Sequence, residues 1–379
     1  MAPSNVQILH PGDVIGETYV VEGCVGGGGM GQVFVARDRR LDRRVAIKLW
    51  HTEVGQSDAA SARFEREARM LSRVVHPNVV AIYDYGQRDG AWYIVMELVD
   101  GLSLGEWLAK HGPLSLDDTL TVTRQVASSL AEAHALGIIH RDIKPGNILL
   151  RRLASGGLVT KVVDFGLARA FDEGSDITAE QTVLGTPYYM SPEQIQCTAL
   201  DGRSDLYSLA IVVFEMITGR VPFRRDTMQG TLIAHLVEVP PPLNMPLRSG
   251  GIPPEFELEL HRAMAKAPED RHGDMMAFAR ALAAAVGVEA AADVGTARCD
   301  TCDGSVRAGD VFCRSCGAPQ ALEACAQCGA PREGKRLACG ACGAALVVTG
   351  RHGGGQTPGS TEGETPLCEQ PAVALVARV

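Results

Sequence analysis

A short polar segment carries residues suited to moving a phosphoryl group. Residues 140–147 read His-Arg-Asp-Ile-Lys-Pro-Gly-Asn, and Asp-Phe-Gly follows, beginning at Asp164. Asp142 can orient an attacking hydroxyl and accept its proton, and Lys144 adds positive charge where negative charge moves in the transition state. Asn147 and Asp164 are hard oxygen ligands of the kind that Mg²⁺ prefers. The spacing therefore indicates a metal-assisted phosphoryl-transfer site.

A glycine-rich stretch nearer the N-terminus could approach phosphates closely, because glycine tolerates positive φ and has no side chain in the way. The same pattern would also suit a dinucleotide-binding loop or a flexible turn. A dinucleotide loop opens a helix, whereas the residues that follow here alternate like a second strand. We therefore expect a β-hairpin lid over a nucleotide. Its residues are Val25, Gly26, Gly27, Gly28, Gly29, Met30, Gly31, Gln32 and Val33.

A lysine ends the next apolar run, which reads Val-Ala-Ile-Lys over residues 45–48. A buried lysine needs an anionic partner, since burying an unpaired charge is costly. Two candidates, Glu65 and Glu67, lie in residues 63–71, where Phe, Ala and Leu are spaced for one face of a helix. An exposed strand end is the alternative interpretation of Lys48.

Together these motifs resemble those of protein kinases. The segment His-Arg-Asp-x-Lys-Pro-x-Asn matches the Ser/Thr form, which has a lysine at the place of Lys144. The phrase Gly-Gly-Met-Gly and the Glu-Val-Pro-Pro-Pro stretch at 238–242 resemble bacterial eukaryotic-like kinases. The resemblance implies an α+β, bilobal fold over residues 19–285, with a small β-rich N-lobe and a larger helical C-lobe. A helix is expected over residues 116–136.

The resemblance also implies roles for individual residues. Asp142 would be the catalytic base, Asn147 and Asp164 would bind Mg²⁺, and Lys48 would hold the ATP phosphates. Glu67 is preferred over its rival as the partner of Lys48, because Arg-Phe-x-Arg-Glu-Ala is the usual setting in this family. Beyond the glycine-rich loop, the ATP site is expected to include Ala46, Lys48, Met96, Glu97 and Val99, the last two through the hinge backbone.

The polar segment 170–182 resembles an activation loop. Arg141 and Arg169 would form a basic pocket able to bind a phosphothreonine and order the loop. We hypothesise autophosphorylation at Thr178 or Thr182. A solvated polar loop without a switch is the alternative.

Two acidic residues beyond the loop are expected to be structural. Glu193 stands where related kinases carry a buried acid, and Arg271 can supply the cation that it needs. Asp205 resembles the helix aspartate that braces the backbone of the catalytic loop.

The C-terminal part carries eight cysteines in four Cys-x2-Cys pairs, arranged as a unit that repeats with a period of 26 residues. Each half offers four thiolates, the tetrahedral set that structural Zn²⁺ takes. Covalent haem would need histidine after the second cysteine, a redox site needs one pair, and rubredoxin-like iron stays an alternative. The array resembles a double zinc ribbon with two zinc ions. Its ligands are Cys299, Cys302, Cys313, Cys316, Cys325, Cys328, Cys339 and Cys342.

Composition limits the partners. The chain has 379 residues and a formal net charge of −9, which disfavours nucleic acid and anionic membranes. The cysteine region has five basic and five acidic residues and one aromatic, Phe312, so protein docking is favoured over nucleic-acid binding. We find no apolar run long enough for a membrane span and no signal peptide, and metal thiolates suit a reducing compartment. We expect a cytoplasmic protein.

The expected organisation is a lead-in (1–18), a kinase domain (19–285), a linker (286–298), a double zinc ribbon (299–342) and a disordered tail (343–379). The expected activity is transfer of the ATP γ-phosphate to Ser or Thr hydroxyls of protein substrates. Two alternatives are a non-catalytic ATP-binding scaffold that presents the ribbons, and a small-molecule kinase, against which the peptide-docking segment at 185–193 argues.

Overall fold

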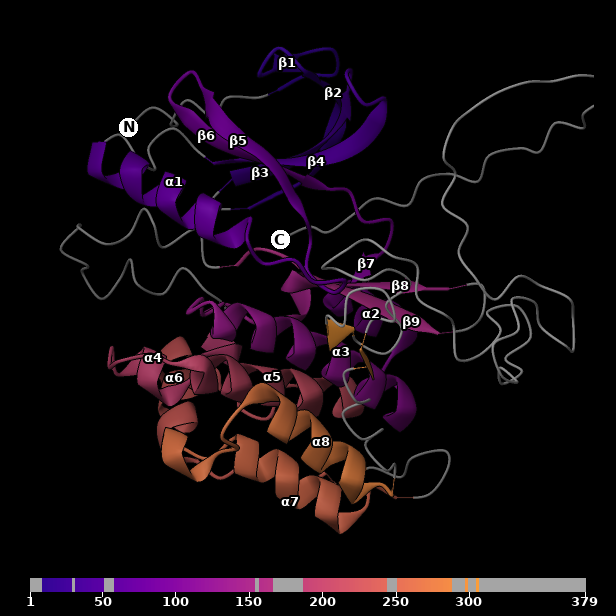
Figure 1. The fold of residues 1–379 in the computed structure, drawn as a ribbon. Helices are drawn as coiled ribbons and strands as arrows, with labels where there is room; N and C mark the ends of the chain where they lie inside the picture. The colour runs from indigo at the N-terminus through magenta and orange to yellow at the C-terminus, as the bar shows by residue number, and fades with distance from the viewer. Residues whose placement is uncertain are drawn as a thin grey trace, which may run out of the picture. The chain divides into compact units, whose positions relative to one another are not determined.

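The structure is a computed structural model, and it describes part of the chain. The described residues are 9–28, 31–50, 58–153, 157–165, 187–243 and 251–287, with two short strands at 297–298 and 305–306. The chain divides into two compact units, Met1–Val288 with Val373–Val379, and Glu289–Ala372. In the first unit, strands β1 to β6 lie together with helix α1, and helices α3 to α8 gather in a second group (Figure 1).

The N-terminal lobe is built on a six-stranded sheet in the order β1-β2-β3-β4-β6-β5, with antiparallel neighbours. The strands are β1 (Val14–Ile15), β2 (Tyr19–Gly28), β3 (Gly31–Asp38), β4 (Arg43–Trp50), β5 (Ile82–Arg88) and β6 (Ala91–Glu97). Apolar side chains such as Phe34, Ile47 and Val95 are fully buried in a cluster that belongs to this sheet. The pairing of β2 with β3 forms the hairpin that was predicted around the glycine-rich loop.

Helix α1 (Asp58–Leu71) is the helix that the structure describes in this lobe. Phe64, Ala68 and Leu71 are buried, as their helical spacing predicted. Phe64 packs between two tryptophans, with ring centroids 5.3 Å from Trp50 and 4.6 Å from Trp92. These aromatic contacts attach α1 to strands β4 and β6, and so place the helix beside the strand that carries Lys48.

The C-terminal lobe is mostly helical. Its elements are β7 (Leu102–Ser103), α2 (Leu104–His111), α3 (Leu116–Ala135), η1 (Pro145–Asn147), β8 (Ile148–Arg152), β9 (Leu158–Val162), η3 (Pro187–Tyr189), α4 (Pro192–Ile195), α5 (Gly202–Thr218), α6 (Met228–Val237), α7 (Pro254–Ala263), η4 (Pro268–Asp270) and α8 (Met275–Ala285). Helix α3 lies where a helix was predicted, within one residue at its end.

Helix α5 is the centre of this lobe. Most of its residues are buried, and it contacts α3, α7 and α8. Asp201 caps its first turn through Arg203 N, and Gly219 ends it in the left-handed conformation at φ 73°, which costs glycine little. This largely buried helix carries Asp205, which contacts the site described below.

In the second unit the structure describes β10 (Ala297–Arg298) and β11 (Ser305–Val306), which pair antiparallel. The eight cysteines of the predicted zinc ribbons lie outside the described residues, as do Arg169, Thr178 and Thr182. Among the helices that the structure describes, none combines the length and hydropathy that a bilayer crossing requires.

Candidate active site

The backbone of the segment 140–147 is held by a buried carboxylate from α5. Asp205 Oδ2 accepts a hydrogen bond from His140 N at 2.8 Å, and Oδ1 accepts one from Arg141 N at 2.7 Å. His134 Nε2 lies 2.8 Å from the same carboxylate. Arg141 has φ 68°, a strained value for a residue with a side chain. The bracing role predicted for Asp205 is therefore present, and it stabilises a conformation that the chain would otherwise avoid.

Asp142, Lys144 and Asn147 meet at one point of this loop. Lys144 Nζ lies 3.0 Å from Asp142 Oδ2. The amide nitrogen of Asn147 donates to the carbonyl of Asp142 at 2.7 Å and to its Oδ2 at 3.0 Å. The Asn147 side chain is therefore fixed with its oxygen directed away from Asp142. Asp142 itself is 47% exposed, so a hydroxyl from solvent can approach it.

Lys48 and Asp164 form an ion pair between the two lobes. Lys48 Nζ in β4 lies 2.8 Å from Asp164 Oδ2, just beyond β9. Burial raises the pKa of Asp164, but the charge and hydrogen bond of Lys48, with the charges of His140 and Lys144, outweigh burial and hold that pKa below its usual value. Asp164 is thus ionised at neutral pH, which its predicted role as a Mg²⁺ ligand requires.

Glu67 lies on α1 and is half-buried. Its pairing with Lys48 stays a prediction. The Lys48 amine forms the ion pair with Asp164 and lies 5.3 Å from the centroid of the Trp50 ring.

The predicted nucleotide-binding residues of the sheet lie close together. Ala46 in β4 is buried and stands opposite Met96 in β6. Glu97 is the last residue of β6, and Val99 lies in the connection that follows. These residues lie in β4, in β6 and in the connection after β6, where the chain passes from the N-terminal lobe to the C-terminal lobe.

The glycine-rich loop is described on both strands of its hairpin. Gly26 pairs with Val33, Gly27 with Gln32 and Gly28 with Gly31, and Val25 is buried. Gly29 and Met30, at the tip, lie outside the described residues.

An apolar hollow beside Asp164 was not predicted from the sequence. It is enclosed by side chains from five segments: Trp50, Leu71, Val74, Val79, Val80, Ile82, Ile94, Met96, Val162, Val163 and Phe165. Apart from Met96, which was expected at the ATP site, each of these residues reads as ordinary core in its own segment. No local signal could have shown that they surround a common space.

The Arg141 side chain has a buried nitrogen that suggests a further contact at this site. Its Nε is buried and has no hydrogen-bond partner among the described residues. A buried guanidinium nitrogen usually finds an acceptor. Arg169, Thr178 and Thr182, which were predicted to act with Arg141, belong to residues 166–186, outside the described part.

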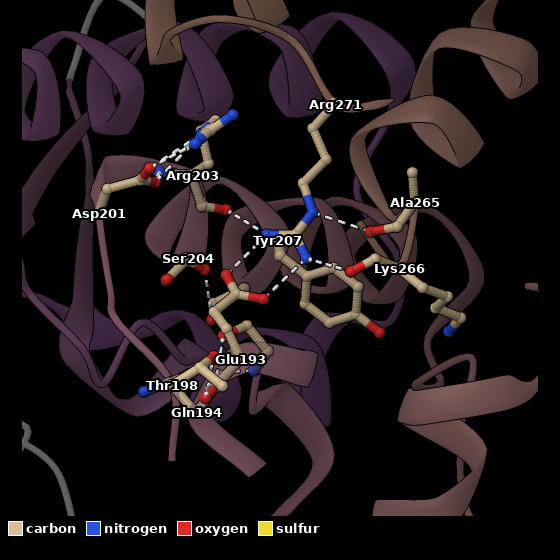
Figure 2. A network of polar contacts seen from close by, with 12 residues as sticks. Glu193, Gln194, Thr198, Asp201, Arg203, Ser204, Tyr207, Ala265, Lys266 and Arg271 are labelled. Carbon is tan, nitrogen blue, oxygen red and sulfur yellow. Dashed lines mark hydrogen bonds and ion pairs between the residues drawn. The ribbon is translucent and has the colours of Figure 1, made fainter. Parts of the chain in front are cut away.

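The predicted ion pair between Glu193 and Arg271 is present and buried. Arg271 Nη1 and Nη2 lie 2.7 and 2.8 Å from the two carboxylate oxygens of Glu193. Figure 2 shows the guanidinium also reaching the carbonyl groups of Ala265 and Lys266. Next to it, Gln194 Nε2 donates to the carbonyl of Arg141 at 2.7 Å, which connects α4 to the segment 140–147.

Tyr189 and Glu215 form a contact that sequence reasoning missed. The Tyr189 hydroxyl donates to Glu215 Oε2 at 2.6 Å. Burial raises the pKa of the Glu215 carboxyl. The hydrogen bond anchors η3 to the central helix α5, so the segment leading into α4 has a fixed position.

Comparison with known proteins agrees with this geometry. Residues 19–277 match the family model of the protein kinase domain. The chain is similar to serine/threonine-protein kinase pkn3 of Myxococcus xanthus, at 40% identity over 273 residues, which cover 71% of this chain and 50% of pkn3. It is also similar to serine/threonine-protein kinase PrkC of Bacillus subtilis (strain 168), at 39% identity over 261 residues, which cover 69% of this chain and 39% of PrkC. The chain thus spans half the length of these relatives or less.

Among solved structures, the kinase domain of Mycobacterium tuberculosis PknI superposes with a TM-score of 0.56 at 28% identity, covering 73% of this chain and 100% of that chain. The lobed arrangement of a sheet followed by helices is therefore the protein kinase fold, and membership of this family implies ATP and Mg²⁺ as cofactors. The chain belongs to the protein kinase family, with a kinase domain of the bacterial Ser/Thr type.

Proposed function

We propose that this chain is a protein kinase that transfers the γ-phosphate of ATP to Ser or Thr hydroxyls of protein substrates. Two sets of contacts at 2.7–3.0 Å carry the proposal. Lys48 pairs with Asp164 between the two lobes, and Asp142 contacts Lys144 and Asn147 within the segment 140–147. Lys48 and Asp164 are far apart in the sequence, and phosphoryl transfer is the chemistry that uses all five residues together.

The donor set fits a magnesium nucleotide. Asp164 is ionised, and Asn147 is held with its amide oxygen turned away from Asp142, so two hard oxygen ligands are available. Lys48 would move from Asp164 to the phosphates of ATP, with Glu67 as its expected support. The bound metal supplies neutralisation of phosphate charge. Ala46, Met96 and the hinge backbone at Glu97 and Val99 would receive adenine.

Asp142 would act on the substrate. Its half-exposed carboxylate can accept a hydrogen bond from a Ser or Thr hydroxyl, orient its oxygen and take its proton. Lys144, 3.0 Å away, would balance the charge that shifts as the phosphoryl group moves. The hydroxyl would approach from solvent, because the other sides of Asp142 are occupied by Lys144 and Asn147.

The experiment is a transfer assay with the purified chain, Mg²⁺, ATP labelled in the γ-phosphate, and protein substrates rich in Ser and Thr. Phosphoamino-acid analysis of the products should give phosphoserine or phosphothreonine. Nucleotide binding without transfer to any protein, the chain included, would contradict the proposal and favour a non-catalytic scaffold.

We further propose activation by autophosphorylation at Thr178 or Thr182, with the phosphate bound by Arg141 and Arg169. The buried Arg141 Nε, for which the described residues offer no acceptor, supports a partner from residues 166–186. Mass spectrometry of active enzyme should find one of these threonines phosphorylated. Full activity with both threonines unmodified would contradict the proposal.

For the second unit we propose a double zinc ribbon over residues 299–342, with two structural zinc ions bound by the eight paired cysteines. The pairing of β10 with β11 supports it, because these strands flank the first pair, Cys299 and Cys302, in sequence. Elemental analysis should give two zinc ions per chain, and iron or no metal would contradict the proposal. We also propose that this module docks to other proteins and that the chain is cytoplasmic.

A further inference from the structure

An ion pair that sequence reasoning did not anticipate joins β9 to the end of β6. Lys161 Nζ lies 2.7 Å from Glu97 Oε2, and the two side chains are only 19% and 28% exposed. Lys161 Nζ also donates to the carbonyl of Val79 at 3.2 Å, and Glu97 Oε2 also accepts from Ala81 N at 3.3 Å. Neighbouring backbone therefore holds both partners in place.

The pair lies where three segments are bonded side by side. Glu97 N donates to the carbonyl of Ala81 at 2.9 Å, Val80 N donates to that of Val162 at 3.0 Å, and Val162 N donates to that of Asn78 at 2.8 Å. Residues 78–81 thus bridge β6 and β9 through the backbone. The Lys161–Glu97 ion pair is a direct side-chain link between the same two strands.

Strand β9 leads from this link to the proposed metal site. Val163 N donates to the carbonyl of Asn147 at 3.0 Å, and His140 Nε2 bonds the carbonyl of Val163 at 2.9 Å. Asp164 follows Lys161 by three residues, and an extended stretch of that length spans only about 10 Å. A shift of Lys161 relative to Glu97 would therefore be passed to Asp164 and Asn147 with little loss.

We propose that Lys161 and Glu97 are positioning residues for the nucleotide. Their ion pair fixes the distance between the hinge end of the cleft, which receives adenine through the backbone at Glu97, and the metal end at Asp164. The inference rests on the proposed kinase function. The side chains of Lys161 and Glu97 would contact neither the reacting atoms nor the nucleotide, and would act only by positioning.

A positioning role and a purely stabilising role predict different effects on the affinities for long and short ligands. ADP with Mg²⁺ extends from the hinge to the metal end, and its affinity depends on the spacing of the two ends. Adenosine occupies the hinge end alone. A pair that merely stabilised the fold would leave the ratio of the two affinities unchanged.

The test uses Lys161→Met and Glu97→Gln in the full chain, with dissociation constants for Mg-ADP and for adenosine measured by calorimetry. We expect each variant to weaken Mg-ADP binding by about five- to tenfold while adenosine affinity stays within about twofold. The double variant should lose no more than either single variant, since both remove the same contact. In turnover assays KM for ATP should rise more than kcat falls, and Lys161→Arg should restore most of the affinity.

Arg152→Met is the matched control. Arg152 in the adjacent strand β8 pairs with Asp118 of α3 at 3.0 Å, a link within the C-terminal lobe that does not connect hinge and metal ends. It should leave both affinities unchanged. If wild-type protein binds Mg-ADP and Lys161→Met binds it equally well, or loses Mg-ADP and adenosine affinity in equal measure, the positioning role is refuted and the kinase proposal stands. If wild-type protein does not bind Mg-ADP, the kinase proposal itself fails.

Discussion

Replacing Arg271 by methionine should cost the kinase domain a large share of its stability. The Arg271 side chain is fully buried, and its guanidinium makes two bonds to Glu193 and three to the carbonyls of Ala265, Arg203 and Lys266. Methionine would fill much of the volume but would leave the Glu193 carboxylate buried without a counter-charge. Breaking a buried pair from one side costs about 3–5 kcal/mol.

For a domain of this size each kcal/mol lowers Tm by about 2–4 °C, so Arg271→Met should lower Tm by about 6–20 °C. Urea unfolding followed by circular dichroism gives the free energy directly. Arg203→Met is the control, because Arg203 pairs with Asp201 at the surface, with side chains 36% and 52% exposed, and such pairs contribute about 0–1 kcal/mol. If Arg271→Met destabilised the domain no more than Arg203→Met, the assignment of a buried structural ion pair would be wrong.

The same pair predicts how stability depends on acid. Burial raises the pKa of Glu193, but the hydrogen bonds and charge of Arg271 outweigh burial and hold the pKa below the ordinary value of 4.5. A carboxylate with a lowered folded pKa contributes stability that is complete above its unfolded pKa and is lost as pH falls through the folded value. The difference in unfolding free energy between wild type and Glu193→Gln should therefore shrink below about pH 4.5.

Two further substitutions test packing and charge. Gly31→Ala should destabilise the domain by about 1–3 kcal/mol, because a Cβ there would collide with the Leu49 carbonyl, whereas Gly23→Ala, with open space, should cost little; thermal unfolding without nucleotide separates them. Burial, followed by the charge of Arg271, lowers the pKa of Lys266 to about 8, so between about pH 8 and 10.5 the unfolded chain binds more protons than the folded chain. Lys266→Met should thus be more stable than wild type at pH 7, with an advantage that shrinks as pH rises above 8, and a difference that stays flat with pH would contradict this.

The sequence was most informative where chemistry restricts the residue types. Asp142, Asn147, Asp164 and Lys48 could be proposed as site residues from the motifs alone, because phosphoryl transfer uses such residues at few spacings. The structure shows Lys48 paired with Asp164 and Asp142 in contact with Asn147, and their catalytic and metal-binding roles stay predictions. Helix α1 was predictable because Phe64 and its neighbours follow the helical period. The braces at Asp205 and Glu193 were predicted through resemblance to the family.

Contacts that depend on tertiary packing alone were not predictable. Lys161 and Glu97 are 64 residues apart, and Tyr189 and Glu215 are 26 apart. Each of these residues reads in its own segment as an ordinary polar residue of a strand, turn or helix. Strand β1, with two residues, is too short to show a period, although its Ile15 is fully buried.

Asp142 is central to the proposed chemistry, because it would act on the substrate hydroxyl within a cleft that binds the nucleotide independently of it. The most direct test is the single-turnover rate of phosphate transfer by Asp142→Asn with ATP bound, together with the affinity of the same variant for Mg-ADP. We expect the rate to fall by about 10²–10⁴-fold while the Mg-ADP affinity stays close to that of wild type. A variant that transfers phosphate at the wild-type rate would contradict this role of Asp142.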